Sequence, residues 1–165
     1  MLNAKLQSNL VYVLKESGLF NCPQFYRDRK FIAAVLAGIA VVWLLHDWIP
    51  VFSSTLTLHW TLLISVLIWQ PLIEELLFRG IIQGQLSKRK WGQQSLLNIT
   101  VANMVTSALF VAIHMLNTSP IWSLTIFIPS LLYGYFRDAF KSVYPAMILH
   151  SIYNFIVIIG LVIYR

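Results

Sequence analysis

Long runs of apolar residues, separated by short polar segments, dominate the chain and set the elements that we predict. Residues 31–49, 51–86 and 142–164 are each long enough for the roughly 20 residues of a helix that crosses a bilayer. Residues 91–136 carry no formal charge over 46 positions. As one helix this run would be ~69 Å long, more than twice the ~30 Å hydrocarbon core. Leu116–Pro120 (Leu-Asn-Thr-Ser-Pro) supplies a break, so the pattern predicts about five membrane-spanning helices.

A different pattern precedes the first predicted span. Leu2, Leu6, Leu10 and Leu14 recur every four residues, with the lysines off that line. This spacing is typical of an amphipathic helix that lies on a membrane surface. We therefore predict one all-α, polytopic membrane domain over residues 1–165, with an interfacial amphipathic segment at 1–30 and a first span at 31–49.

Composition and charge favour the lipid bilayer, and not nucleic acid, as the partner of this chain. It is 58% hydrophobic and 11% charged, with a net charge of +6. The basic residues fall in the N-terminal segment and in two short loops, 87–91 and 136–141, and form no continuous stripe that would neutralise phosphates. The positive-inside rule then predicts a cytoplasmic N-terminus. We expect an integral membrane protein of a bacterial inner membrane. Cys22 is the only cysteine, so no internal disulfide is available.

Polar groups inside membrane spans are costly and usually functional, and six side chains within the predicted spans are candidates for chemistry. They are Glu74, Glu75 and Arg79 on the second span, His114 on the third, and His150 and Asn154 on the fifth.

Helical spacing groups these residues. Glu75 and Arg79 are four positions apart with the acid first, which is the favourable order for an ion pair. Such a pair would leave Glu74, about 100° round the helix, available for chemistry. Phe110 and His114 share a face in the same way, as do His150 and Asn154.

Depth along the helices brings three of these residues to a similar level. Counted from the basic loops, Glu74 is ~21 Å deep and His150 is ~20 Å deep, or ~14 Å if counted from Lys141. If Asn98 caps the third span, His114 is ~24 Å deep.

One glutamate and two histidines at one level can support hydrolysis of an amide bond in two ways. Glu74, His114 and His150 could hold Zn²⁺ with an open position for water. Alternatively, Glu74 could act as general base without a metal while the histidines and Asn154 donate hydrogen bonds to the oxyanion.

Three ordered motifs carry a resemblance to a known family: Glu-Glu-Leu-Leu-Phe-Arg from Glu74, Phe-Val-Ala-Ile-His from Phe110, and His-Ser-Ile-Tyr-Asn from His150. In this order they resemble the EExxxR, FxxxH and HxxxN motifs of the CAAX-protease and bacteriocin-processing (CPBP, or Abi-type) intramembrane proteases. The resemblance covers a four-helix catalytic core over residues 55–162.

The resemblance implies endopeptidase activity. It implies that Glu74 activates water, that Glu75 and Arg79 support it, and that His114, His150 and Asn154 complete the site. The family is often labelled metalloprotease, although a metal-free glutamate mechanism is also proposed. We favour the metal-free form because the histidines lie on separate helices, without an HExxH-type pair.

The expected substrate is a membrane-anchored protein or peptide, cut at a leader or at a C-terminal sorting tail. Prenyl-cysteine substrates are less expected, because larger relatives have extra spans that surround the prenyl group. Two alternatives stay open: a non-enzymatic relative with an immunity or scaffold role, and an ion-coupled transporter. The second would require paired repeats, which the sequence lacks. The sequence does not fix the oligomeric state.

Overall fold

The computed structural model describes residues 11, 15, 17–45 and 59–163, and these residues are mostly helical. A short 3₁₀ helix, η1 (Phe25–Arg27), precedes α2 (Arg29–Leu45). The remaining elements, in chain order, are α3 (Trp60–Ile64), η3 (Ser65–Trp69), α4 (Gln70–Glu75), η4 (Leu76–Gln83), α5 (Gly84–Leu86), β1 (Ser95–Leu96), β2 (Ile99–Thr100), α6 (Val101–His114), α7 (Pro120–Thr125), α8 (Phe127–Phe140) and α9 (Tyr144–Ile163). The predicted all-α class is confirmed, with one small β-hairpin added.

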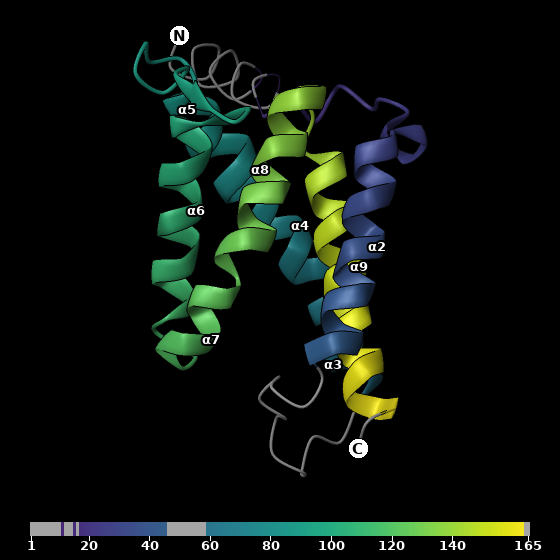
Figure 1. Cartoon of the computed structure of the whole chain (residues 1–165). Coiled ribbons are helices and arrows are strands. Elements are labelled where there is room, and N and C mark those ends of the chain that lie inside the picture. The colour runs from purple at the N-terminus through teal and green to yellow at the C-terminus, as the bar shows by residue number, and fades with distance from the viewer. Residues whose placement is uncertain (1–10, 12–14, 16, 46–58, 164–165) are drawn as a thin grey trace, which may run out of the picture.

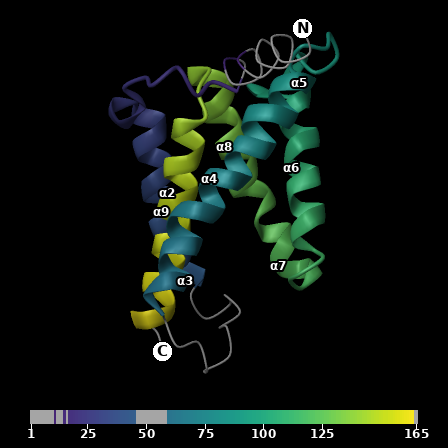
Figure 2. The ribbon, with the colours of Figure 1, turned by 180° about the vertical axis from the view of Figure 1, so that it is seen from behind.

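The helices run roughly side by side between two ends of the molecule (Figure 1). The elements from α3 to α5 form one continuous helix, Trp60–Leu86, which crosses the back face diagonally from α9 towards α6 (Figure 2). On the other face α8 packs against both α6 and α9, and α2 packs against α9. Helix α4 also contacts α9, so the middle of the long helix is held within the bundle.

Trp60–Leu86 is, within the described ranges, the one helix both long and apolar enough to cross a membrane. Residues 101–114 and 144–160 form shorter apolar helices. Residues 1–10, 12–14 and 16 of the predicted interfacial segment lie outside the described residues. So do residues 46–58, where the first predicted span ends and the second begins. Where residues 17–28 are described, they form a turn and η1 and no α-helix.

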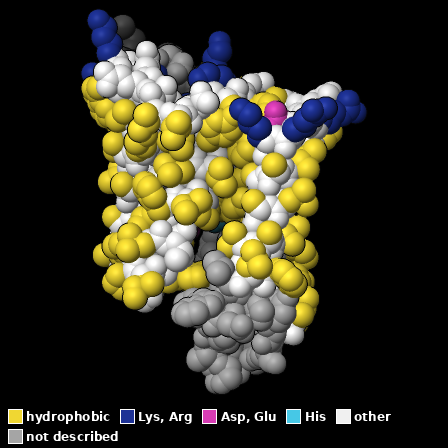
Figure 3. All heavy atoms as spheres, viewed as in Figure 1, with side chains coloured by type: hydrophobic (Ala, Val, Ile, Leu, Met, Phe, Trp, Pro, Cys, Tyr) yellow, Lys and Arg dark blue, Asp and Glu magenta, His cyan; other side chains and the backbone are white. Residues whose placement is uncertain are grey.

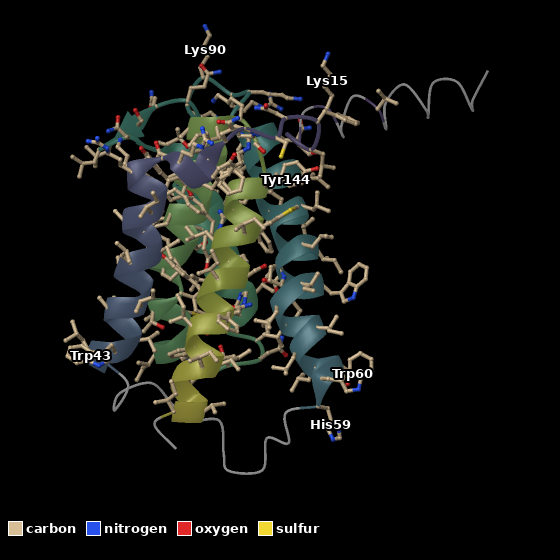
Figure 4. The ribbon with its side chains drawn as sticks, turned by 90° about the vertical axis from the view of Figure 1, so that its right-hand side faces the viewer. Lys15, Trp43, His59, Trp60, Lys90 and Tyr144 are labelled. Carbon is tan, nitrogen blue, oxygen red and sulfur yellow. The ribbon has the colours of Figure 1, made fainter. Side chains whose placement is uncertain are left out.

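Charged and apolar side chains are separated along the long axis of the molecule. Lysines and arginines gather at one end, above a body whose surface is largely hydrophobic (Figure 3). Lys15 and Lys90 lie at this basic end, and Trp43, His59 and Trp60 lie at the opposite end (Figure 4). Outward-facing residues of the body, among them Ile39, are about half exposed, as expected where lipid replaces water as the surrounding medium.

Pro71 explains an irregular stretch of the long helix, where η3 is wound as π-helix. In η3 the Gln70 N–H donates to the carbonyl of Ser65, five residues back. The next donor in that pattern would be the N–H of Pro71, which proline lacks. The Val66 carbonyl is therefore left to find a partner outside its own helix.

The entry to α6 differs from the prediction. Thr100, and not Asn98, is the N-cap residue, because its side chain accepts a hydrogen bond from the Asn103 N–H. Asn98 instead lies with Leu97 at the tip of the β1–β2 hairpin, and both have left-handed backbone angles (φ 65° and 52°). A two-residue hairpin turn of this kind normally uses glycine or asparagine at both positions, so a leucine is unusual there.

The break predicted at Leu116–Pro120 is confirmed, but it comes earlier than expected. Helix α6 ends at His114, where the Thr118 hydroxyl donates to the His114 carbonyl, and Ser119 caps α7. His114 therefore lies at the end of α6, ~20 Å from its first residue, and not within a longer span. A second break separates α7 from α8, because Pro129 cannot donate to the carbonyl of Thr125.

Candidate active site

Glu75 is the centre of the buried polar cluster, because its two carboxylate oxygens bind different partners. Oε2 accepts a hydrogen bond from Arg79 Nε at 3.0 Å, one turn further along the same helix. Oε1 lies 2.9 Å from Nδ1 of His150, which comes from α9. The side chains of Glu75 and Arg79 are fully buried. The predicted ion pair is confirmed, and it also orients an imidazole.

Arg79 uses its remaining nitrogens to join three helices. Nη2 donates to the Ser130 hydroxyl of α8 at 2.6 Å, and Nη1 lies 3.4 Å from the Ser107 hydroxyl of α6. The guanidinium also lies over the ring of Phe110, 5.6 Å from its centroid. A buried charge is tolerated only when its donors are satisfied, and these contacts meet that need.

Gln83 lies one helical turn after Arg79, on the same helix face as Glu75 and Arg79. It accepts from Arg79 at 3.5 Å and donates to the carbonyl of Gly134 at 3.0 Å. Gly134 has no side chain, and a Cβ there would lie 1.9 Å from Oδ1 of Asn103. The close approach of α6, α8 and η4 around the cluster therefore depends on this glycine.

Glu74 differs from its neighbour in being accessible. Its side chain is 29% exposed, and its Oε2 lies 3.8 Å from Nε2 of His150. Because Nδ1 of His150 faces an ionised, arginine-paired carboxylate, the Nδ1 proton is donated to Glu75, and Nε2 is the atom that faces Glu74. Tyr133 stacks on the His150 ring, with centroids 4.9 Å apart and planes 13° apart, which fixes the orientation of the imidazole.

His114 reaches the same region from the end of α6. Its Nδ1 donates to the Phe110 carbonyl at 2.8 Å, so Nε2 is available on the other side of the ring. The predicted packing of Phe110 beside His114 is confirmed, with centroids 4.3 Å apart. The Phe110 ring also contacts His150 edge-on at 6.0 Å. Both imidazoles lie within electrostatic range of the Glu74 carboxylate.

Asn154 lies on the same face of α9 as His150, but its side chain forms a hydrogen bond with a different helix. Its Nδ2 donates to the carbonyl of Val66 at 2.9 Å, which is the acceptor that Pro71 leaves without a donor. The side chain thus ties α9 to η3, one turn beyond His150. This contact makes Asn154 a residue that positions helices.

The structure thus brings together Glu74, Glu75, Arg79, His114 and His150, and it places Asn154 beside them. It adds four residues that the sequence reasoning missed: Gln83, Ser107, Ser130 and Tyr133. Two of these had a signal, because Gln83 follows Arg79 by one turn, and Ser107 lies two turns before His114 on the same helix face. The other two are recognisable only once α8 is packed against its neighbours.

A divalent metal requires donors gathered around one point. The chemistry of the donors suits zinc, since both histidines have Nδ1 held by an acceptor and Nε2 available, as metal-binding histidines usually do. The spacing does not suit it: within the described ranges no three His, Cys, Asp or Glu side chains lie close enough to hold one ion. The arrangement therefore does not fit a metal centre with Glu74, His114 and His150 as ligands.

The candidate active site thus consists of a buried, oriented histidine beside a more accessible carboxylate, within a helical bundle whose outer surface is largely hydrophobic (Figure 3). The family model "Type II CAAX prenyl endopeptidase Rce1-like" matches residues 55–156. The chain belongs to this family, which identifies it as a protease and a membrane protein acting on membrane-associated peptides or proteins. Comparisons with curated proteins and with solved structures gave no match.

Proposed function

We propose that the protein is an intramembrane endopeptidase in which Glu74 activates the attacking water. One observation carries this assignment: the accessible Glu74 carboxylate lies 3.8 Å from Nε2 of an oriented His150. That separation is too long for a strong direct hydrogen bond, and it allows both atoms to contact one water molecule. Catalytic contacts in a substrate-free site are often long and shorten when substrate binds.

In the proposed step Glu74 takes a proton from the water, and the water oxygen forms a bond to the carbonyl carbon of the scissile peptide. The carbonyl π electrons move to oxygen, giving a tetrahedral oxyanion. Protonated imidazole of His114 or His150 donates from Nε2 to this oxyanion. Glu74 then delivers its proton to the leaving amine while the oxyanion electrons re-form the carbonyl and the C–N bond breaks, which gives a carboxylic acid and an amine.

Glu75 and Arg79 support this chemistry without touching the substrate. Glu75 accepts the Nδ1 proton of His150, so the proton that the charged imidazole gives to the oxyanion is the one on Nε2, and Arg79 balances the charge of Glu75. Asn154 fixes the position of α9 against the long helix through Val66. No step in this mechanism uses a metal.

The substrate class follows from the position of the site. Glu74 lies near the middle of the helix that is long enough to span a bilayer, so the scissile bond must reach it from a segment already in the membrane. We propose a membrane-anchored protein or peptide, cut at a leader or a C-terminal sorting tail. The five predicted spans and the cytoplasmic N-terminus are part of the same proposal.

The decisive experiment uses the full chain co-expressed with tagged membrane-anchored candidates, with cleavage followed by the size of the tagged product. We expect Glu74→Gln to lower the cleavage rate at least 100-fold, since the general base is lost while size and shape are kept. Ile73→Ala, an exposed neighbour on the same helix, serves as the matched control and should cleave normally. Normal cleavage by Glu74→Gln would rule out this role for Glu74.

Two further outcomes separate the remaining alternatives. Purified protein treated with a chelator should retain its activity, whereas loss of activity that zinc restores would show that a metal is required. If Glu74→Gln and His114→Ala preserve the biological phenotype that deletion of the protein abolishes, the protein acts as a non-enzymatic immunity or scaffold protein instead.

A further inference from the structure

A groove of about 470 Å³ lies between the first turns of α2, the hairpin tip and the middle of α8. This volume lies within the roughly 300–1,000 Å³ of typical small-molecule sites. It is separate from the candidate active site, since none of its lining residues belongs to that cluster. Its lining consists of Lys30, Ala33, Ala34, Leu97, Asn98, Ile99, Leu131, Leu132, Tyr135 and Phe136.

The groove is apolar along its length and positively charged at one point. Two small residues of α2, Ala33 and Ala34, make the room, and leucines of α8 line the other wall. Lys30 carries the formal charge among the described lining residues, and it is exposed. Lys30 is the second residue of α2, and Trp43 near the other end of this helix lies opposite the basic end (Figure 4). The Lys30 charge therefore lies where headgroups meet the hydrocarbon core if α2 spans the bilayer.

Lys30 is held in place and not left to move freely. Its Nζ donates to the Tyr135 hydroxyl at 2.9 Å and lies 5.5 Å from the centroid of the Tyr135 ring. This hydrogen bond raises the pKa of the Lys30 ammonium, so the group stays charged. The nearby Asp28 carboxylate is engaged elsewhere, because it accepts from the Phe31 N–H at the start of α2.

The hairpin tip gives a second, independent indication. Leu97 is 87% exposed and Leu96 is 68% exposed, so the hairpin presents an apolar tip beside the groove. Leu97 also adopts a left-handed backbone that a leucine disfavours. Strain and exposure at one residue beside a groove are explained if the leucine inserts among acyl chains.

We propose that this groove binds one anionic phospholipid, with its phosphate at the Lys30 ammonium and one acyl chain along α2 and α8. Leu97 covers the upper part of that chain. A charged ammonium at the rim of an apolar channel matches a phosphate followed by a hydrocarbon tail. A peptide strand would instead need backbone hydrogen-bond partners along the groove, and the α2 and α8 walls offer none because their backbone groups are paired within helices.

The test uses the purified full chain in neutral detergent, titrated with a short-chain phosphatidylglycerol or with phosphatidylcholine of the same chain length. Native mass spectrometry counts the bound lipids. We expect phosphatidylglycerol to saturate at one molecule per chain and to bind more tightly than phosphatidylcholine. Lys30→Gln should weaken phosphatidylglycerol binding about fivefold, the effect of removing one basic residue near an anionic headgroup.

Three controls make the result specific. Lys90→Gln removes the same charge from the basic end outside the groove and should change binding less than twofold. Ala33→Trp fills the groove at an exposed position and should prevent saturable binding with Lys30 intact. Inorganic phosphate should not displace the lipid. Equal loss in the Lys30 and Lys90 variants, unchanged binding to Ala33→Trp, or displacement by phosphate alone would each overturn the proposal.

Discussion

Adjacent glutamates have opposite environments in this molecule, and helix geometry is the cause. Successive residues point about 100° apart, so Glu75 faces the inside of the bundle while Glu74 stays partly accessible. Glu75 is fully enclosed with Arg79 and therefore has a fixed charge and fixed partners. Glu74 has no such partner at hydrogen-bond distance among the described residues. Only a carboxylate without a fixed partner, as in Glu74, is able to bind water and exchange a proton.

Arg79→Met should destabilise the protein strongly. The substitution keeps much of the side-chain volume but leaves the Glu75 carboxylate buried without its cation, which typically costs about 3–5 kcal/mol. Chemical unfolding of the detergent-solubilised protein, followed by tryptophan fluorescence, measures the change.

The double variant Glu75→Gln/Arg79→Met is the informative control for this pair. It removes both charges, so it should recover at least half of the stability lost in Arg79→Met. A double variant as unstable as Arg79→Met would show that the loss comes from the contacts of Arg79 with Ser130 and Phe110, and not from an unpaired charge.

At the scale of elements, prolines account for two of the irregular points in the helices, and at the first of them another residue compensates. Pro71, in α4, cannot donate to the Val66 carbonyl of η3, and Asn154 supplies that donor from α9. Pro129 removes another at the junction of α7 and α8. The hydrogen bond from Asn154 to Val66 lies beside the candidate active site, so it also fixes how α9 packs against the long helix.

Pro71 and Asn154 should therefore be energetically coupled. Asn154→Leu leaves the partly buried Val66 carbonyl without a donor, which costs about 1–3 kcal/mol of unfolding free energy. Pro71→Ala restores a backbone N–H to the long helix, so the same Asn154→Leu change should cost at least about 1 kcal/mol less in that background. A double-mutant cycle on unfolding free energies measures the difference. Equal costs in both backgrounds would mean that Asn154 does not act through this carbonyl.

The sequence predicted the helical class and most of the candidate site because both depend on local spacing. Four-residue spacing alone identified the ion pair of Glu75 with Arg79 and the packing of Phe110 on His114. It could not predict that Glu75 binds His150, 75 positions away, or that Ser130 binds Arg79, because those contacts depend on how helices pack. The early end of α6 was missed because hydroxyls of Thr118 and Ser119 compete with the helix for backbone groups.

At the scale of the whole molecule, the charge distribution predicts an orientation. Lys15, Lys90 of the first basic loop and Tyr144, which follows the second basic loop, lie at one end, as the positive-inside rule requires of a cytoplasmic face (Figure 4). Asn21 donates to the Phe140 carbonyl, which fixes the neighbouring Cys22 at this basic end. Cys22 is exposed and is the only cysteine in the chain, so it is a native reporter of this face.

Cys22 should react with a membrane-impermeant maleimide in inside-out vesicles and be protected in intact cells. In the double variant Cys22→Ser/His59→Cys the reporter moves to the opposite end, so the two preparations should give the reverse result. The reversal is the essential observation, because unequal reactivity of a single cysteine could reflect local shielding. If both reporters react from the same side, the two ends do not face different compartments and the helices do not span the bilayer as proposed. If the pattern is fully inverted, the basic end faces outward, and the lipid groove and the route of substrates to Glu74 must be assigned to the other leaflet.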